Sequence, residues 1–238
     1  MTAQEKSPRE SRTDETVRAL TELIIARGLH SGDPLPSEVE LCEELGVGRN
    51  SLREAVRTLR ATGVLEVRHG SGTYVGVLSM RSLSDELLFH SRLATADSTA
   101  YLRQLGEVRE ALEMGLITNL VADGYVPDVE LLTTLLERMD AEAQTGHIDP
   151  ATDQQFHEAL LAPLKNPVAI MLLQVFWRVF NELLEPENKP MAATKSADRH
   201  HAILMAIKAA DARGARIAVR AHFEGFRDRL GMEDRLAD

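Results

Sequence analysis

The longer, C-terminal part of the chain carries helical patterns of apolar residues and no alternating pattern typical of a β-strand. Glycine and proline residues interrupt these patterns, for example at 124–127 and at 166–167. Aromatic residues make up only 4% of the chain, which favours helices packed through aliphatic side chains over a β-sandwich. We therefore expect a mainly α fold class, with an all-helical bundle over 84–232. The expected helices cover 84–93, 98–124, 128–146, 150–163, 167–186, 194–210 and 212–230.

The N-terminal part has a different order of elements. A helical pattern leads up to Gly28, and a second helix begins after Ser37, where Glu40 three residues later completes a capping box. A third helix is expected over 49–62, followed by two short strands around a glycine-rich tip. The expected domains are a disordered tail at 1–12, a winged helix-turn-helix at 13–77, a linker at 78–83 and the bundle at 84–232.

The net charge of −10 is unusual for a protein that binds nucleic acid, but the distribution of charge along the chain matters more than the sum. Between residues 45 and 76 the chain has five arginines and only two glutamates. The sequence therefore predicts a local basic stripe on an acidic protein. Its arginines are Arg49, Arg53, Arg57, Arg60 and Arg68.

The third expected helix has the features of a helix that enters the DNA major groove. Arg49 and Arg53 lie four residues apart on one face, and Arg57 extends the same line. An arginine there can hold a guanine edge with two hydrogen bonds or bind a phosphate. Asn50 and Ser51 at the helix start are within reach of phosphates or bases. A solvated basic face is the alternative, and the order of elements favours DNA.

The segment resembles the winged helix-turn-helix of GntR-type bacterial transcription regulators. The similar residues run from Leu-Pro-Ser-Glu at 35–38, through Gly-Arg-Asn-Ser-Leu-Arg-Glu-Ala at 48–55, to His-Gly-Ser-Gly-Thr-Tyr-Val at 69–75. The resemblance covers about residues 15–77. It implies that Arg49 and Arg53 read bases or hold phosphates, and that His69 and Gly70 at the wing tip enter the minor groove. Ser37, within the matched segment, is a further expected DNA contact.

Two positions depart from the family pattern. The family usually has arginine after Leu-Pro-Ser-Glu, where this chain has Val39, and serine or threonine before the first arginine of the third helix, where it has Gly48. Glycine caps a helix less well and lacks a hydroxyl that could contact a phosphate. Both differences leave DNA binding expected but bear on the operator sequence.

Four side chains in the C-terminal part form a candidate metal-binding set. Asp153 and His157 lie four residues apart on one helix face, and His200 and His222 fall on two later helices. One carboxylate and three imidazoles suit a divalent transition metal. Each histidine alone is more often a core or surface residue, and spacing does not show that the three converge.

This region is similar to the FCD domain, the helical ligand-binding domain of the FadR branch. The resemblance rests on Asp153-x3-His157, Asn-Pro at 166–167, and the segments 200–207 and 211–222. In many FCD domains one aspartate and three histidines hold a metal. The resemblance selects His200 over His201 as a ligand. Zinc is the first expectation, with nickel or manganese as alternatives.

The resemblance also indicates where an effector binds. Segment 105–113 is similar to the first long FCD helix, whose arginine often faces the ligand pocket, which points to Arg109 as a carboxylate anchor. The alternative is a surface ion pair between Arg109 and Glu113. Glu113, Arg178 and Asn181 are further candidates for effector contacts. A sugar acid, hydroxy acid or dicarboxylate satisfies a metal and an arginine equally well.

We therefore expect a non-enzymatic, cytoplasmic transcription regulator that binds a palindromic operator as a homodimer and is controlled by a small organic acid. Repression is the commoner arrangement, although the sequence does not give the sign. A metal-sensing regulator, or a metal-dependent enzyme with a DNA-binding appendage, are alternatives; an acyl-CoA regulator is disfavoured by the metal residues. The single cysteine, Cys42, excludes a disulfide framework, and no apolar run is long enough to span a membrane.

Overall fold

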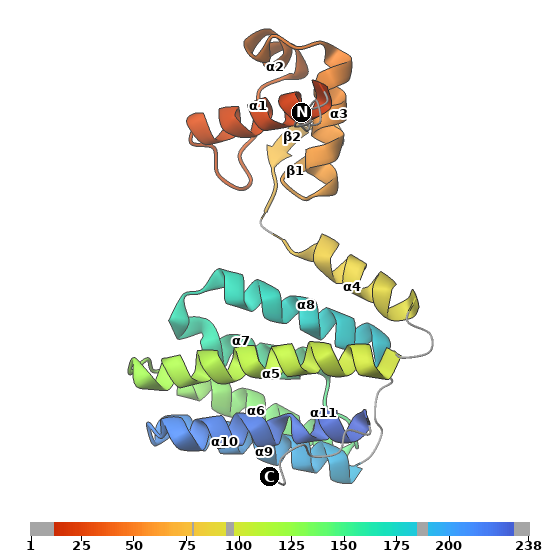
Figure 1. The fold of residues 1–238 in the computed structure, drawn as a ribbon. Helices are drawn as coiled ribbons and strands as arrows, with labels where there is room; N and C mark the ends of the chain where they lie inside the picture. Colours follow the sequence, from red (N-terminus) through yellow and green to blue (C-terminus); the bar gives the residue numbers. More distant parts are fainter. Residues whose placement is uncertain (1–11, 78, 94–97, 185–189, 231–238) are drawn as a thin grey trace, which may run out of the picture. The chain divides into compact units, whose positions relative to one another are not determined.

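The computed structural model describes residues 12–77, 79–93, 98–184 and 190–230 (Figure 1). The chain divides into two compact units, Met1–Ser82 and Leu83–Asp238. The expected tail lies almost wholly outside the described residues, as does the expected end of the bundle at residue 232. The expected mainly α fold is confirmed, because helices make up all of the second unit's regular structure within these ranges.

The first unit contains three helices, α1 (Arg12–Ala26), α2 (Glu38–Leu45) and α3 (Arg49–Ala61). The capping box predicted for α2 is present: the Glu40 amide donates to the Ser37 hydroxyl, and the Ser37 amide donates to the Glu40 carboxylate. Gly46 ends α2 in a left-handed conformation, at φ 64°, which glycine adopts without steric cost. The chain therefore turns within three residues from α2 into α3.

A two-stranded antiparallel sheet follows α3. Strand β1 (Leu65–Arg68) pairs with β2 (Gly72–Val75), with Leu65 opposite Val75 and Arg68 opposite Gly72. Leu65 packs into the core that the three helices share, so the hairpin is attached to the helices at its base. The fully or nearly buried members of this core are Leu20, Leu23, Ile24, Leu35, Leu41, Leu52, Leu59 and Leu65.

The second unit begins with α4 (Arg81–Leu93). It continues with α5 (Ser98–Ala122), α6 (Val129–Gln144), α7 (Pro150–Leu161), a 3-10 turn (Ala162–Leu164), α8 (Pro167–Leu183), α9 (Pro190–Lys208), α10 (Ala212–His222) and α11 (Glu224–Arg229). Local signals explain several starts. Asn166 accepts a hydrogen bond from the Ala169 amide and Pro167 occupies the first turn of α8, while Asp211 caps α10 in the same way.

Helix α5 crosses the bundle between α8 and α10 in the view of Figure 1 and contacts both. The main core lies between α5, α6, α7, α8, α9 and α10, and its largest fully buried side chain is Phe156 of α7. Aliphatic residues supply most of the remaining volume, as the low aromatic content predicts. Among the described residues, no helix is long and apolar enough to cross a membrane.

Several element boundaries differ from the prediction. Helix α4 begins at Arg81, inside the expected linker, and α9 begins at Pro190 rather than at 194. The single helix expected over 212–230 is instead two helices that meet at Phe223. Phe223 is buried, and Gly225 two residues later favours an interruption because glycine has the largest backbone entropy to lose in a helix.

Candidate functional site

The predicted DNA-contacting arginines lie on the exposed face of α3, opposite its buried residues Leu52, Ala55 and Leu59. Arg53 is paired through Nε to both carboxylate oxygens of Glu38, at 3.1 Å each. These contacts use one edge of the guanidinium and orient it. Arg57 is paired with Glu54 at 2.7 Å, and both side chains are largely exposed.

The start of α3 has no side-chain cap. Gly48 holds the N-cap position in an extended conformation, and no side chain accepts from the first amides of the helix. Arg49 and Asn50, the first two residues of the helix, are exposed, and Ser51 is half-buried. Uncapped amides at a helix N-terminus can donate to a phosphate. The start of α3 thus retains phosphate-binding capacity despite the missing hydroxyl.

The other residues predicted to contact DNA lie at the tip of the β1–β2 hairpin and at the N-cap of α2. His69 and Gly70 are exposed at the turn between the strands, with Gly70 at φ 76°. Behind them the Arg68 guanidinium stacks over the Tyr74 ring at 4.2 Å from its centroid, which stiffens the hairpin. The Ser37 hydroxyl is engaged in the capping box with Glu40, whose pKa is lowered by these hydrogen bonds.

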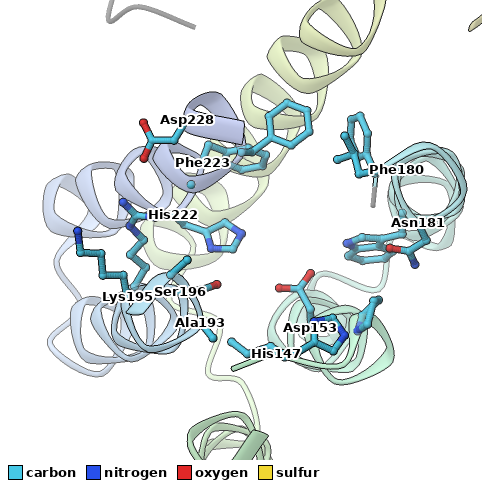
Figure 2. A pocket seen from close by; sticks show the side chains of 18 of the residues that line it. His147, Asp153, Phe180, Asn181, Ala193, Lys195, Ser196, His222, Phe223 and Asp228 are labelled. Carbon is cyan, nitrogen blue, oxygen red and sulfur yellow. The ribbon is translucent and has the colours of Figure 1, made fainter. Parts of the chain in front are cut away.

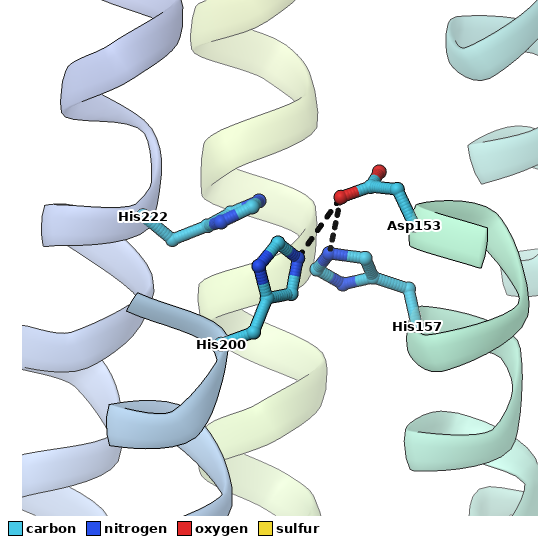
Figure 3. Close-up of side chains that lie close together, drawn as sticks. All are labelled: Asp153, His157, His200 and His222. Atoms are coloured by element: carbon cyan, nitrogen blue, oxygen red, sulfur yellow. Dashed lines mark ion pairs between the residues drawn. The ribbon is translucent and has the colours of Figure 1, made fainter. Parts of the chain in front are cut away.

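The four predicted metal ligands come together in the second unit (Figure 3). Asp153 and His157 project from α7, His200 from α9 and His222 from α10. One donor atom of each lies within 4.8 Å of the others. His157 and His200 are completely buried, and His200 Nε2 lies 2.9 Å from Asp153 Oδ1. His201, which was predicted to lie outside the set, faces Asp140 of α6 instead.

Two of the imidazoles have a defined partner on the side away from the cluster. His200 Nδ1 lies 2.8 Å from the carbonyl oxygen of Ser196, one turn earlier in α9. His157 Nδ1 lies 3.0 Å from Glu113 Oε2 on α5. The Ser196 carbonyl favours the tautomer of His200 in which Nδ1 carries the proton and Nε2 is available as a ligand, whereas the contact of His157 with Glu113 is close but not aligned as a hydrogen bond.

Burial and neighbouring charges determine the protonation of the cluster. Burial alone would raise the pKa of Asp153, but the three histidines lower it well below its ordinary value. Burial likewise opposes ionisation of Glu113, and His157 and Arg109 outweigh it, so the pKa of Glu113 is also lowered. For His222, burial and the neighbouring imidazoles lower the pKa far below its ordinary value. Asp153 is therefore ionised and His222 is neutral, as metal ligands must be. For His157, burial lowers the pKa, but Glu113 and Asp153 outweigh it, so the pKa of this ring is raised.

The donor set fits a divalent metal. Four buried imidazole nitrogens have no hydrogen-bond partner among the described residues, namely both nitrogens of His157, His200 Nε2 and His222 Nδ1. Unpaired buried polar atoms of this kind are costly unless an ion or water satisfies them. In a tetrahedral site with bonds of about 2.1 Å the ligand atoms lie about 3.4 Å apart, so the four donor atoms, which lie within 4.8 Å of one another, would draw closer around an ion.

A pocket of about 570 Å³ opens next to the cluster (Figure 2). Asp153 and His222 form part of its wall, and Trp177, Phe180 and Phe223 supply apolar surface. Arg109 lines it as well, although its side chain is only 9% exposed. The Nη2 atom of Arg109 is buried and without a hydrogen-bond partner among the described residues. The pocket thus combines an apolar wall with an arginine donor and two candidate metal ligands.

Two of the four residues predicted to contact the effector line the pocket, and two do not. Arg109 and Asn181 line the pocket. Glu113 does not line it: the side chain is completely buried and accepts a hydrogen bond from Arg109 Nε at 2.7 Å. Arg178 does not line it either, because its guanidinium turns to Ser84 and Asp85 of α4. The ion pair of Arg109 with Glu113 exists, but inside the bundle rather than on its surface.

Sequence reasoning missed polar residues of α9 that line the pocket, namely Lys195, Ser196 and Arg199. Lys195 and Arg199 lie four residues apart and therefore share a helix face. They also lie within five residues of His200. A basic pair at helical spacing just before a candidate metal ligand was the available signal.

Comparison with known proteins places both units in one family. The model of bacterial regulatory proteins of the gntR family matches residues 12–75, and that of the FCD domain matches 104–225, more than half of the chain. The chain belongs to the gntR family of bacterial regulatory proteins. This GntR protein with an FCD domain is thus a transcriptional regulator, rather than the enzyme considered as an alternative.

The relatives agree with this assignment. The GntR protein is 31% identical over 230 residues to the Glc operon transcriptional activator of Escherichia coli K12, covering 90% of this chain and 89% of the relative. It is 28% identical over 158 residues to the galactonate operon transcriptional repressor of the same strain, covering 66% and 69%. A solved GntR structure from Streptococcus agalactiae matches with a TM-score of 0.67 and 30% identity, over 91% of this chain and 99% of that one.

Proposed function

We propose that this GntR protein represses a metabolic operon by binding a palindromic operator as a homodimer, and that a small organic acid in the FCD pocket releases it. The arrangement of α3 supports DNA contact, because its arginine face is exposed and its first amides are uncapped. Two identical recognition helices match two half-sites only in a symmetric pair of chains. Arg49, Arg53, Arg57, Asn50 and Ser51 are the contacts proposed on α3, with Ser37, His69 and Gly70 flanking them.

The observation that carries the effector proposal is the position of Arg109 beside the candidate metal ligands. Its Nη2 is buried and lies 3.9 Å from Asp153 Oδ2, and Arg109 is part of the pocket lining. A carboxylate in the pocket would give this nitrogen a charge-assisted hydrogen bond. The relative named for galactonate, a sugar acid, favours sugar acids within the wider class of hydroxy acids and dicarboxylates.

Asp153, His157, His200 and His222 would hold a divalent ion, with zinc as the first candidate and nickel or manganese as alternatives. A bound divalent ion supplies a Lewis-acidic centre that attracts a carboxylate oxygen. Asn181 at the pocket wall offers both a donor and an acceptor for hydroxyl groups of the acid. The apolar wall of Trp177 and Phe180 excludes water from the carboxylate and strengthens its interaction with Arg109.

We expect Arg53→Ala to weaken binding to the selected operator by about 1–3 kcal/mol if Arg53 holds a base. The operator is first selected from random duplexes by the wild-type chain, and affinities are measured by anisotropy at one fixed salt concentration. Arg18→Ala, on α1 and outside the proposed DNA-contact set, is the control. Equal losses on selected and unrelated duplexes would assign Arg53 to a phosphate instead.

Organic acids should dissociate the complex of the zinc-loaded protein with its selected operator, and the same acids should have less effect after chelation. Galactonate, lactate and succinate represent the three acid classes, and their amides, which lack the carboxylate, are the controls. Linkage requires that an acid which weakens DNA binding is itself bound more weakly by the DNA complex. Tighter DNA binding with acid would reverse the proposed sign, and dissociation by chelation alone would favour the metal-sensing alternative.

A further inference from the structure

Glu113 is a completely buried carboxylate that does not line the pocket and is not one of the four candidate metal ligands. It projects from α5, whereas the candidate ligands project from α7, α9 and α10. A buried carboxylate is retained at a cost unless charged partners compensate it. Its two oxygens have different neighbours, and these neighbours belong to the two parts of the proposed site.

The first oxygen, Oε1, accepts a hydrogen bond of 2.7 Å from Nε of Arg109. The second, Oε2, lies 3.0 Å from Nδ1 of His157. Neither Oε2 nor Nδ1 has a hydrogen-bond partner among the described residues, since the contact between them is close but not aligned as a hydrogen bond. Each atom is therefore available to the other, and one carboxylate joins the proposed effector anchor to a candidate metal ligand.

We propose that Glu113 is the positioning residue of the metal site, which fixes the ring and tautomer of His157 and at the same time holds the guanidinium of Arg109 against the pocket. This inference rests on the proposed function, since it takes His157 as a metal ligand and Arg109 as the effector anchor. It replaces the direct effector contact that the sequence predicted for Glu113.

The geometry gives Glu113 this role through both of its partners. A proton on His157 Nδ1 that faces Glu113 leaves Nε2 unprotonated toward the cluster, where Asp153 Oδ1 lies 3.9 Å away. The Ser196 carbonyl serves His200 in the same way, but it is neutral and part of a helix. The neighbour of His157 differs in being a carboxylate that also accepts from Arg109, a residue of the pocket wall.

The test compares zinc affinity of the full chain, measured by chelator competition, between wild type and Glu113→Gln. The amide has one acceptor oxygen for two donors, so its NH2 group must face either Arg109 or His157. We expect zinc affinity to fall by about 10- to 100-fold. Glu110→Gln is the matched control, because Glu110 lies on the same helix and pairs with Arg227 at 2.6 Å, away from the cluster. Its zinc affinity should equal that of wild type.

Nitrogen-15 spectra of the zinc-loaded histidine rings supply a readout that a purely structural role would not move. Wild type should show a slowly exchanging proton on His157 Nδ1, and Glu113→Gln should lose it. If that variant does not fold, Glu113→Asp replaces it in the test. The shorter aspartate carboxylate cannot reach both Arg109 and His157, so zinc affinity should again fall. Unchanged affinity in a folded Glu113 variant would overturn the inference. Failure of wild type to bind zinc would instead refute the proposed metal site.

Discussion

His200→Ala is expected to remove stoichiometric zinc from the purified protein and to lower zinc affinity by more than about 100-fold, beyond the effect of a partner in the surrounding shell. The reason is its central place in the cluster: the ring is completely buried, and its Nε2 lies 2.9 Å from Asp153 Oδ1. Among the described residues, the candidate metal set contains only two other imidazoles, those of His157 and His222. Elemental analysis gives the stoichiometry, and chelator competition gives the affinity.

His201→Ala is the matched control for this substitution. His201 is adjacent in sequence, but its ring is half-exposed and contacts Asp140 on α6 at 3.0 Å. Zinc content should therefore equal that of wild type. Loss of zinc in His201→Ala with retention in His200→Ala would show that the two histidines exchange roles and that the ligand set is misassigned.

Arg109→Met is expected to lower the free energy of unfolding of the metal-free second unit by about 3–5 kcal/mol, the range for breaking a buried ion pair by removing one partner. The guanidinium is nearly buried, donates to Glu113 and lies over the rings of Trp177 and Phe223, at 5.4 and 5.3 Å from their centroids. Loss of the guanidinium leaves the Glu113 carboxylate with its contact to His157. This remaining contact favours the lower end of the range.

Urea unfolding followed by the fluorescence of Trp177, the single tryptophan, reports this unit directly. The sample must be free of metal, because a ligand of the folded state adds its own stabilisation. The double variant Arg109→Met with Glu113→Gln should lose less than the sum of the two single variants, since it leaves no buried charge unpaired. Strictly additive losses would show that the two side chains do not act as a pair.

The sequence predicts most of the fold because its signals are local. Asn166 and Pro167 mark the start of α8, and Ser37 with Glu40 marks the start of α2, without reference to the rest of the chain. The break between α10 and α11 was missed for a physical reason. Burial of Phe223 depends on packing against other helices, and residue spacing alone does not show that packing.

The candidate metal ligands were predictable from the sequence, whereas the contacts that surround them were not. The four candidate ligands were found through a family resemblance, and Asp153 with His157 also through helical spacing. The contact between Glu113 and His157 joins α5 to α7 across the bundle, and the sequence contains no spacing rule for it. Arg178 was mistaken for a pocket residue because the sequence does not show which face of α8 turns to α4.

Helix α8 presents two neighbouring rows of side chains to different surroundings. One row lines the pocket and consists of Trp177, Phe180 and Asn181. The other row faces α4, where Arg178 pairs with Asp85 and Glu182 pairs with Arg92. A hydrogen-bonded helix moves as a rod, so a displacement of one row is also a displacement of the other. A molecule in the pocket that displaces α8 must therefore either displace α4 as well or break the ion pairs between the two helices. Helix α4 follows the winged helix-turn-helix along the chain. Only a short segment of polypeptide therefore separates a displaced α4 from the DNA-binding unit.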